Sequence, residues 1–150
     1  SLVLSVEYQK AAQMIQNEIQ INDYDFVISL GIASDREIIT PELIGINFAH
    51  STTPDNAGLV KQYSEILANG SESFFSTLPN QKFIENLNDN EIKAKISTTA
   101  GSYVCNTVMY TALHTVFKYN KNSKAGFIHV PCDLSLDTLI NALTICINTL

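Results

Sequence analysis

Hydrophobic and polar positions follow two kinds of pattern along the chain. Apolar side chains recur every three or four residues from Tyr8 to Ile19, which is the spacing of one face of an α-helix. Continuous apolar runs at 2–6 and 26–30 instead indicate strands, the second of them buried as in a parallel sheet. A helix between two strands is typical of α/β layering.

The remainder of the chain continues this alternation. The stretch 49–70 is polar and rich in turn residues, so we expect a long loop there, with one short helix at 60–67. Beyond it we predict, in order, a helix after Pro79, a short strand at 94–97, a helix at 103–118, a buried strand at 126–130 and an amphipathic terminal helix capped by Asp133 or Ser135.

Composition and charge limit the function classes. Hydrophobic residues make up 45% and charged residues 16% of the 150 residues, which is typical of a folded chain and enough for one domain over 1–150. Nine Lys and Arg against fifteen Asp and Glu give a net charge of −6, which argues against a general nucleic-acid binder. No apolar run is long enough for a membrane helix, and none resembles a secretory signal. We therefore expect neither a nucleic-acid nor a membrane partner.

The three cysteines, Cys105, Cys132 and Cys146, are an odd and sparse set. This argues against a disulfide framework and favours a reducing compartment. No CxxC is present, and His129 with Cys132 is too little for a zinc site, so we expect no metal. Cys146 lies on the apolar side of the terminal helix and is interpreted as a core residue.

Cys105 differs from the other two cysteines in its position. It follows the small-residue turn 98–102 and lies in the first turn of the predicted helix. Backbone N–H groups and the helix dipole stabilise a thiolate at such a place, and the same N–H groups are suited to hold an oxyanion. A buried core cysteine fits the same position, and the pattern alone leaves both interpretations open.

A thiolate nucleophile needs a base, and the chain has three histidines. His114 lies nine residues beyond Cys105 on the same helix and therefore faces the opposite side. His50 lies in the polar loop without an evident ordering partner. His129 lies near the carboxyl end of a buried strand, where site residues gather in α/β sheets. It is the best base candidate, with a structural histidine as the alternative.

Glu42 is the candidate for the group that orients the imidazole. It follows Thr40-Pro41 and precedes the apolar run 43–48, and an acid at the edge of a buried strand needs a partner. An ordinary solvated glutamate is the alternative. The nearby charged residues Asp35, Arg36 and Glu37 fit a solvated face equally well.

Together these residues resemble the pyroglutamyl peptidase I family of cysteine peptidases. The stretch 97–106 is similar to the cysteine signature of that family, 126–131 to its histidine signature, and 39–47 to its glutamate segment. The stretches 54–58 and 75–79 fit as well. The spacings between Glu42, Cys105 and His129 also agree with the family, and the resemblance extends over nearly the whole chain.

The resemblance implies a three-layer α/β/α sandwich with a mixed twisted sheet, assembled as a homo-oligomer, either a dimer or a tetramer. It implies a cytoplasmic enzyme without a cofactor that removes the pyroglutamyl residue from a peptide with a blocked N-terminus. Cys105 would be the nucleophile, His129 the general base and then acid, and Glu42 the partner of the imidazole. The residues expected to contact the substrate are Ile32, Tyr103 and Val104.

The chain also departs from the family pattern. It begins after the family's first strand and the Phe- and Gly-rich loop that follows it, so we expect an N-terminally incomplete domain. Ile32 stands where the family usually has Gln, Thr52 stands where it has Arg, and the loop 132–135 is shorter. Two alternatives follow: a related thiol hydrolase for another small N-terminal acyl group, or a non-catalytic oligomeric homologue that binds ligands.

Overall fold

A three-stranded sheet in the order β1-β5-β2 forms the centre of the computed structural model, which describes residues 1–150. β1 (Phe26–Ala33) runs parallel to β5 (Lys124–Pro131), whereas the short β2 (Thr40–Pro41) pairs antiparallel with β5. A second, two-stranded sheet pairs β3 (Ile44–Ile46) antiparallel with β4 (Ser73–Phe75). The central sheet is therefore mixed, as expected.

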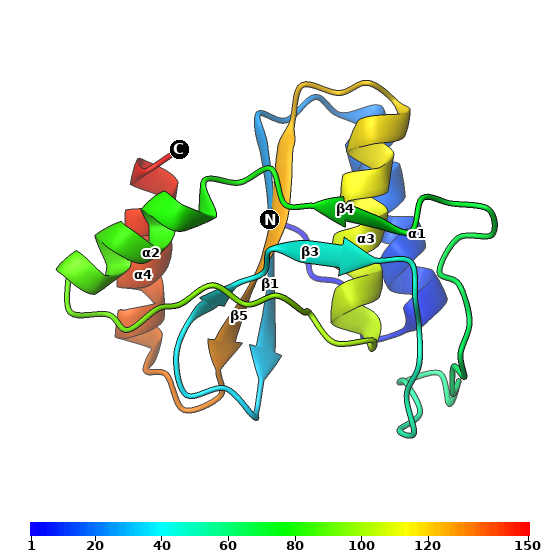
Figure 1. The fold of residues 1–150 in the computed structure, drawn as a ribbon, viewed down its shortest axis with the longest axis horizontal. Coiled ribbons are helices and arrows are strands. Elements are labelled where there is room, and N and C mark those ends of the chain that lie inside the picture. The colour runs from blue at the N-terminus through cyan, green and yellow to red at the C-terminus, as the bar shows by residue number, and fades with distance from the viewer.

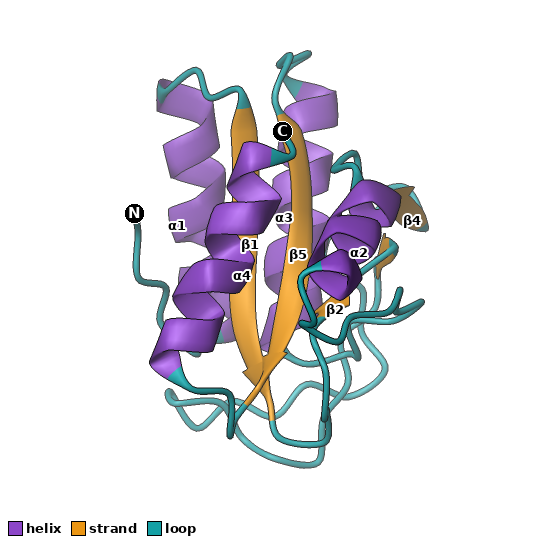
Figure 2. Cartoon of the chain, turned by 90° about the vertical axis from the view of Figure 1, so that its left-hand side faces the viewer, coloured by secondary structure: helices purple, strands orange, loops and turns teal.

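Helices cover both faces of the central sheet (Figure 1). α1 (Tyr8–Ile21) and α3 (Val104–Lys118) lie on one face, and α2 (Asn80–Asp89) and α4 (Leu136–Asn148) lie on the other. Figure 2 shows the strands between these two helix pairs. The predicted three-layer α/β/α arrangement is confirmed.

β5 contributes side chains to two hydrophobic cores, because neighbouring residues on a strand point to opposite faces. Ala125 and Phe127 belong to the core formed with α1 and α3, whereas Ile128 and Val130 belong to the core formed with α2 and α4. His129 alternates with Ile128 and Val130. It therefore shares the face of Phe127, on which α3 packs.

β1 is an edge strand, which corrects the prediction that it is buried. One of its edges pairs with β5, and no other strand of the structure pairs with it. Most of its residues are half-buried, and Ile32 is 71% exposed. The apolar run 26–30 therefore belongs to a half-buried edge strand.

The segment 2–6 forms no strand, contrary to the prediction. Leu4 packs against the core of α1 and α3, but Val3 is 90% exposed. The carbonyl of Val6 accepts a hydrogen bond from the Asn56 N–H at 2.9 Å, a contact with the long loop and not with a strand. The apolar pattern of the segment 2–6 thus reflects partial packing against the core, without a neighbouring strand to pair with.

The long loop 49–70 is present, but the helix predicted at 60–67 is not. The side chain of Asn47 accepts hydrogen bonds from the N–H groups of Ile66 and Leu67, both at 2.9 Å. Tyr63 has a left-handed φ of 44°, which an α-helix cannot contain. Side-chain bonds from outside the segment therefore replace the helical ladder here.

The predicted strand at 94–97 is reduced to two isolated bridges, Ala94 with Ile39 and Ser97 with Glu42. At the second bridge, the Ser97 N–H donates to the Pro41 carbonyl at 3.0 Å. Pairing only at the two ends does not make a strand. It does hold the Glu42 segment beside the turn that precedes α3.

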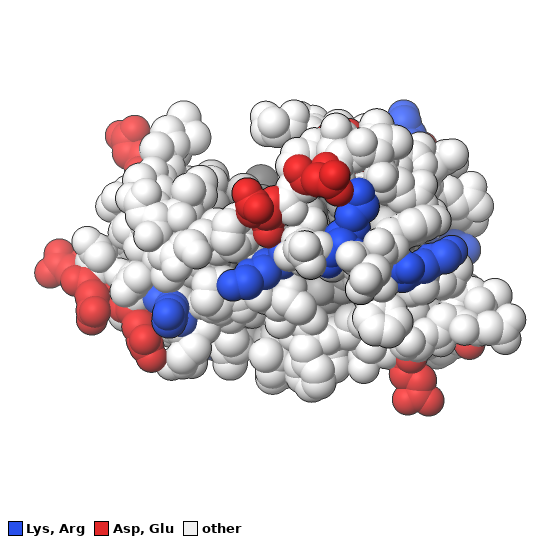
Figure 3. Space-filling view, turned by 90° about the horizontal axis from the view of Figure 1, so that it is seen from above, with Lys and Arg blue, Asp and Glu red and all other residues white.

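The four predicted helices at 8–19, after Pro79, at 103–118 and at the C-terminus are confirmed. The Ser135 hydroxyl accepts a hydrogen bond from the Thr138 N–H at 3.1 Å, so Ser135 and not Asp133 caps α4. None of the helices combines the length and the apolar character that a membrane crossing requires. On the face shown in Figure 3, Lys and Arg side chains are interspersed with acidic ones.

Candidate active site

Cys105 lies in the first turn of α3. This helix begins at the same end of the molecule as the carboxyl ends of β1 and β5 (Figure 1). The residue before the helix, Tyr103, provides no side-chain cap for the first N–H groups. Asn106 is fully buried and donates to the carbonyls of Ile46 and Phe48, both at 2.9 Å. β3 therefore anchors the start of α3, and the positive end of the helix dipole faces the Cys105 thiol.

Glu42 and His129 form a buried pair. The His129 Nδ1 donates to the Glu42 Oε1 at 2.7 Å, and the two residues are 5% and 0% exposed. The antiparallel register of β2 places Thr40 opposite His129, and the Glu42 N–H donates to the Phe127 carbonyl at 2.8 Å. Strand pairing thus brings Glu42 to the imidazole, and the Nδ1 bond leaves Nε2 for a second partner.

Gly31 connects the thiol to this pair. It lies opposite His129 in the parallel register of β1 and β5. A Cβ added at Gly31 would be 3.1 Å from the Cys105 Sγ and 2.7 Å from Cζ of Phe127. The sulfur therefore lies against the backbone of the residue that is paired with His129. The structure brings together the three residues predicted from the sequence.

The pKa of His129 is strongly raised. Burial by itself would lower this pKa, because it disfavours the charged imidazole. Hydrogen bonding to Cys105 and to Glu42, together with the negative charges of both groups, outweighs burial and raises the pKa to about 9. At neutral pH the imidazole is therefore charged.

This shift makes the stability of the fold depend on pH. The folded-state pKa of about 9 lies above the ordinary value of 6.5, so the imidazolium contributes its full stability below pH 6.5 and loses it as the pH rises through 9. We expect the His129 Cε1–H signal in NMR to titrate near pH 9, and the midpoint to fall in Cys105→Ala. A wild-type midpoint near 6.5 would contradict this electrostatic description.

The close packing at Gly31 predicts that Gly31→Ala impairs the site. The added methyl group would overlap the buried Phe127 ring, so either the ring or the Cys105 sulfur must move. We expect a loss of about 1–3 kcal/mol in the free energy of unfolding and a fall of ~10²-fold in turnover, as for other ångström-scale misplacements. Urea unfolding and steady-state kinetics measure the two effects. Lys124→Ala, at the exposed start of the neighbouring strand β5, is the control and should change neither.

Arg36 is the site residue that sequence reasoning missed. Its guanidinium lies 3.4 Å from the Glu42 Oε1 and donates to the Thr99 carbonyl at 3.0 Å and to the Thr40 hydroxyl at 3.2 Å. The interpretation as a solvated face is therefore wrong for Arg36, although its neighbours Asp35 and Glu37 are exposed. No local pattern distinguishes the inward member of such a cluster.

The other two histidines have separate roles. His114 is half-buried and stacks on Tyr110, and both burial and the charge of Lys118 lower its pKa. It is a packed histidine. His50, for which the sequence suggested no ordering partner, stacks on Tyr63 with a centroid distance of 4.3 Å. Its buried Nδ1 has no hydrogen-bond partner, so no group orients His50 as a base.

The remaining cysteines also differ from Cys105. Cys146 is 2% exposed in the core of α2 and α4, which confirms its interpretation as a core residue, and burial raises the pKa of its thiol to about 11. Cys132 is exposed just beyond β5. Cys105 is half-buried, so its sulfur is neither sealed in the core nor fully in solvent.

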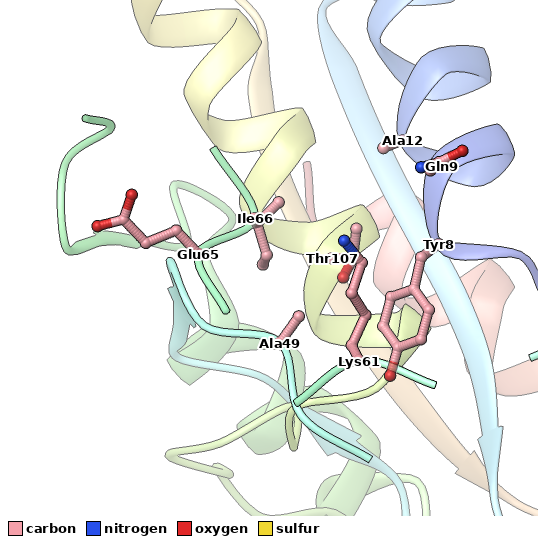
Figure 4. A pocket seen from close by; sticks show the side chains of 8 residues that line it. All are labelled: Tyr8, Gln9, Ala12, Ala49, Lys61, Glu65, Ile66 and Thr107. Atoms are coloured by element: carbon pink, nitrogen blue, oxygen red, sulfur yellow. The ribbon is translucent and has the colours of Figure 1, made fainter. Parts of the chain in front are cut away.

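A groove of about 870 Å³ opens beside Cys105. Its lining is mostly hydrophobic, extends along β1 to the N-terminal residues 1–6, and includes Ile32, Tyr103 and Val104, the three residues expected to contact a substrate. A second cavity, of about 80 Å³, lies beside α1 and is lined by none of the three candidate catalytic residues (Figure 4). The groove is therefore the candidate substrate site.

Comparisons with known proteins identify the family of the chain. The chain matches the family model described as pyroglutamyl peptidase over residues 1–150. It is 36% identical to the pyrrolidone-carboxylate peptidase of Thermococcus onnurineus, over 97% of this chain and 78% of that protein. It is 40% identical to that of Streptococcus pyogenes, over 83% of this chain and 58% of that protein.

The crystal structure of pyroglutamyl peptidase I from Bacillus amyloliquefaciens superposes with a TM-score of 0.93 at 29% identity, covering 97% of this chain and 75% of that one. From this match over its whole length, we conclude that the chain belongs to the pyroglutamyl peptidase family of cysteine peptidases.

Proposed function

We propose that the protein is a cysteine exopeptidase that removes an N-terminal pyroglutamyl residue from peptides, with Cys105 as nucleophile, His129 as general base and acid, and Glu42 as the partner of the imidazole. The observation that carries the proposal is the buried 2.7 Å bond from the His129 Nδ1 to the Glu42 Oε1, next to a thiol at the start of a helix. A charged imidazole beside a thiolate is the resting state that a cysteine peptidase needs.

In the first half of the reaction, the Cys105 Sγ attacks the pyroglutamyl carbonyl carbon and forms a C–S bond. Negative charge collects on the carbonyl oxygen, where the uncapped N–H groups at the start of α3 are suited to receive it. As the C–N bond breaks, His129 gives the proton on Nε2 to the leaving amine. The shortened peptide leaves, and a thioester remains on Cys105.

In the second half, water attacks the thioester carbonyl while the His129 Nε2 accepts a proton from that water. The C–S bond breaks, pyroglutamate leaves and the thiolate returns with the imidazolium beside it. Glu42 stays ionised and bound to Nδ1 throughout, so that the same tautomer serves both halves.

Hydrolysis of a pyroglutamyl amide tests the proposal. We expect turnover by the wild-type protein, and a covalent acyl-enzyme on the Cys105-containing peptide when the reaction is quenched and analysed by mass spectrometry. Prolyl amide, which lacks the lactam carbonyl, is the matched control substrate. Absence of both turnover and acylation would overturn the proposed activity and leave the non-catalytic binding homologue as the better description.

An altered substrate is the second candidate function, because Ile32 and Thr52 replace polar residues that the family resemblance leads one to expect. Ile32 is 71% exposed and lines the groove, where it offers no hydrogen bond to a lactam. Loss of such a bond costs large factors in discrimination. A panel of small N-terminal acyl amides distinguishes the two candidates, and exclusive turnover of the pyroglutamyl amide would exclude this one.

Two further expectations belong to the same proposal: a homo-oligomer, dimer or tetramer, and a cytoplasmic location. An apolar stripe on α4 supports self-association, since Leu136, Ile140 and Ile147 share one helix face and are more than half exposed. Sedimentation velocity measures the assembly state directly.

A further inference from the structure

Both donors that reach the Glu42 carboxylate share one oxygen atom. The His129 Nδ1 and the Arg36 guanidinium lie 2.7 Å and 3.4 Å from the Glu42 Oε1. The other oxygen, Oε2, is buried without a hydrogen-bond partner. Arg36 therefore competes with His129 for the same acceptor, and does not simply neutralise an unused part of the carboxylate.

The position of Arg36 is itself well defined. Its side chain is 20% exposed, and the two arms of the guanidinium reach the Thr40 hydroxyl and the Thr99 carbonyl. Thr40 lies on β2 and Thr99 lies in the turn before α3. The planar guanidinium thus connects the strand that positions Glu42 to the turn that precedes Cys105. These contacts require several N–H donors in a fixed planar arrangement, which a guanidinium provides.

We propose that Arg36 is a positioning residue, which shares the Glu42 Oε1 with His129 and so limits how tightly Glu42 holds the imidazolium proton. This inference depends on the proposed function. The titratable groups that face His129 are Glu42 after β2 and Cys105 on α3, with the Arg36 cation behind Glu42. The first two stabilise the imidazolium, and Arg36 is the cation that opposes them.

The consequence for catalysis concerns the leaving group. An amide leaving group must take a proton from His129 as the C–N bond breaks, whereas an activated ester departs without it. If Arg36 is lost, the undivided carboxylate holds the imidazolium more strongly, and the imidazolium becomes a weaker acid. Turnover of the amide should therefore fall more than turnover of the ester.

The test compares Arg36→Gln with the wild-type protein on two substrates of one acyl group, the pyroglutamyl alkyl amide and the pyroglutamyl nitrophenyl ester. We expect kcat for the amide to fall about tenfold, as general-acid contributions of this kind allow, with KM unchanged and kcat for the ester nearly retained. The NMR titration midpoint of His129 should move to higher pH. Lys82→Gln removes an equal charge from the exposed face of α2 and should change none of these values.

The outcomes separate this inference from the proposed function. If the wild-type protein hydrolyses neither substrate, the proposed function fails, while the His129 midpoint still tests Arg36. An unchanged or lowered midpoint, or equal losses on amide and ester, would show a merely structural role and overturn the inference. Arg36→Met, which keeps an unbranched side chain but removes its charge, serves if Arg36→Gln does not fold. An amide-to-ester ratio equal to the wild type in Arg36→Met overturns the inference as well.

Discussion

Cys105→Ala should reduce the turnover of a pyroglutamyl amide by about 10⁴-fold or more, the usual consequence of removing the nucleophile of a catalytic triad. No other thiol is placed to replace it, since Cys146 is buried in the opposite core and Cys132 is exposed beyond β5. The fold should persist, because Cys105 is only half-buried and its backbone in α3 is unchanged.

Steady-state kinetics with thermal unfolding as a control measures this effect. Cys132→Ala is the matched variant, because it removes a thiol without touching the Glu42–His129 pair, and it should keep wild-type turnover. Residual activity in Cys105→Ala within tenfold of wild type would require another nucleophile and would exclude the thioester route.

Glu42→Gln has the second-largest expected effect, a fall in kcat of about 10²–10⁴-fold with KM nearly unchanged. The substitution keeps the size of the side chain but replaces a charged acceptor by a neutral amide. The His129 Nδ1 then loses the carboxylate that orients it, and Arg36 loses its ion-pair partner at 3.4 Å. The imidazolium is no longer stabilised by a negative charge, so the midpoint of His129 should fall.

Glu37→Gln is the matched control. Glu37 is exposed, and its substitution removes the same charge from the same part of the chain. Steady-state kinetics and the NMR titration of His129 distinguish loss of imidazole orientation from a general effect of the removed charge. Equal effects of the two variants would mean that Glu42 acts only as a distant charge, and would contradict its role as the partner of the imidazole.

The sequence was most informative where a local signal coincided with a chemical requirement. The small-residue turn before a helix indicated Cys105, and the carboxyl end of an apolar strand indicated His129. Both are properties of a few consecutive residues, which explains why they were readable without a structure. The sequence signal for Glu42 was weaker, since a glutamate beside an apolar run is compatible with a solvated surface. The family resemblance supplied its role.

The errors in the fold share a physical cause. The segments 2–6, 60–67 and 94–97 have apolar patterns that predict regular elements, but regular elements also need hydrogen-bond partners. At 60–67 the Asn47 side chain occupies two of the N–H groups, and at 94–97 only the two ends pair. Such competition between side chain and backbone depends on contacts distant in sequence.

The sequence by itself determined the layered α/β class and the four helices, because helical periodicity and turn chemistry are local. Local patterns also indicated Cys105 and His129 as candidates, whereas the family resemblance supplied the role of Glu42. Only the tertiary structure decided how these residues meet. The register of β1, β2 and β5 places Gly31 and Glu42 beside His129, and Asn106 fixes the start of α3. It also decided that Arg36 points inward while Asp35 and Glu37 do not. Such facts depend on which strands pair and in which register, and no local pattern carries that information.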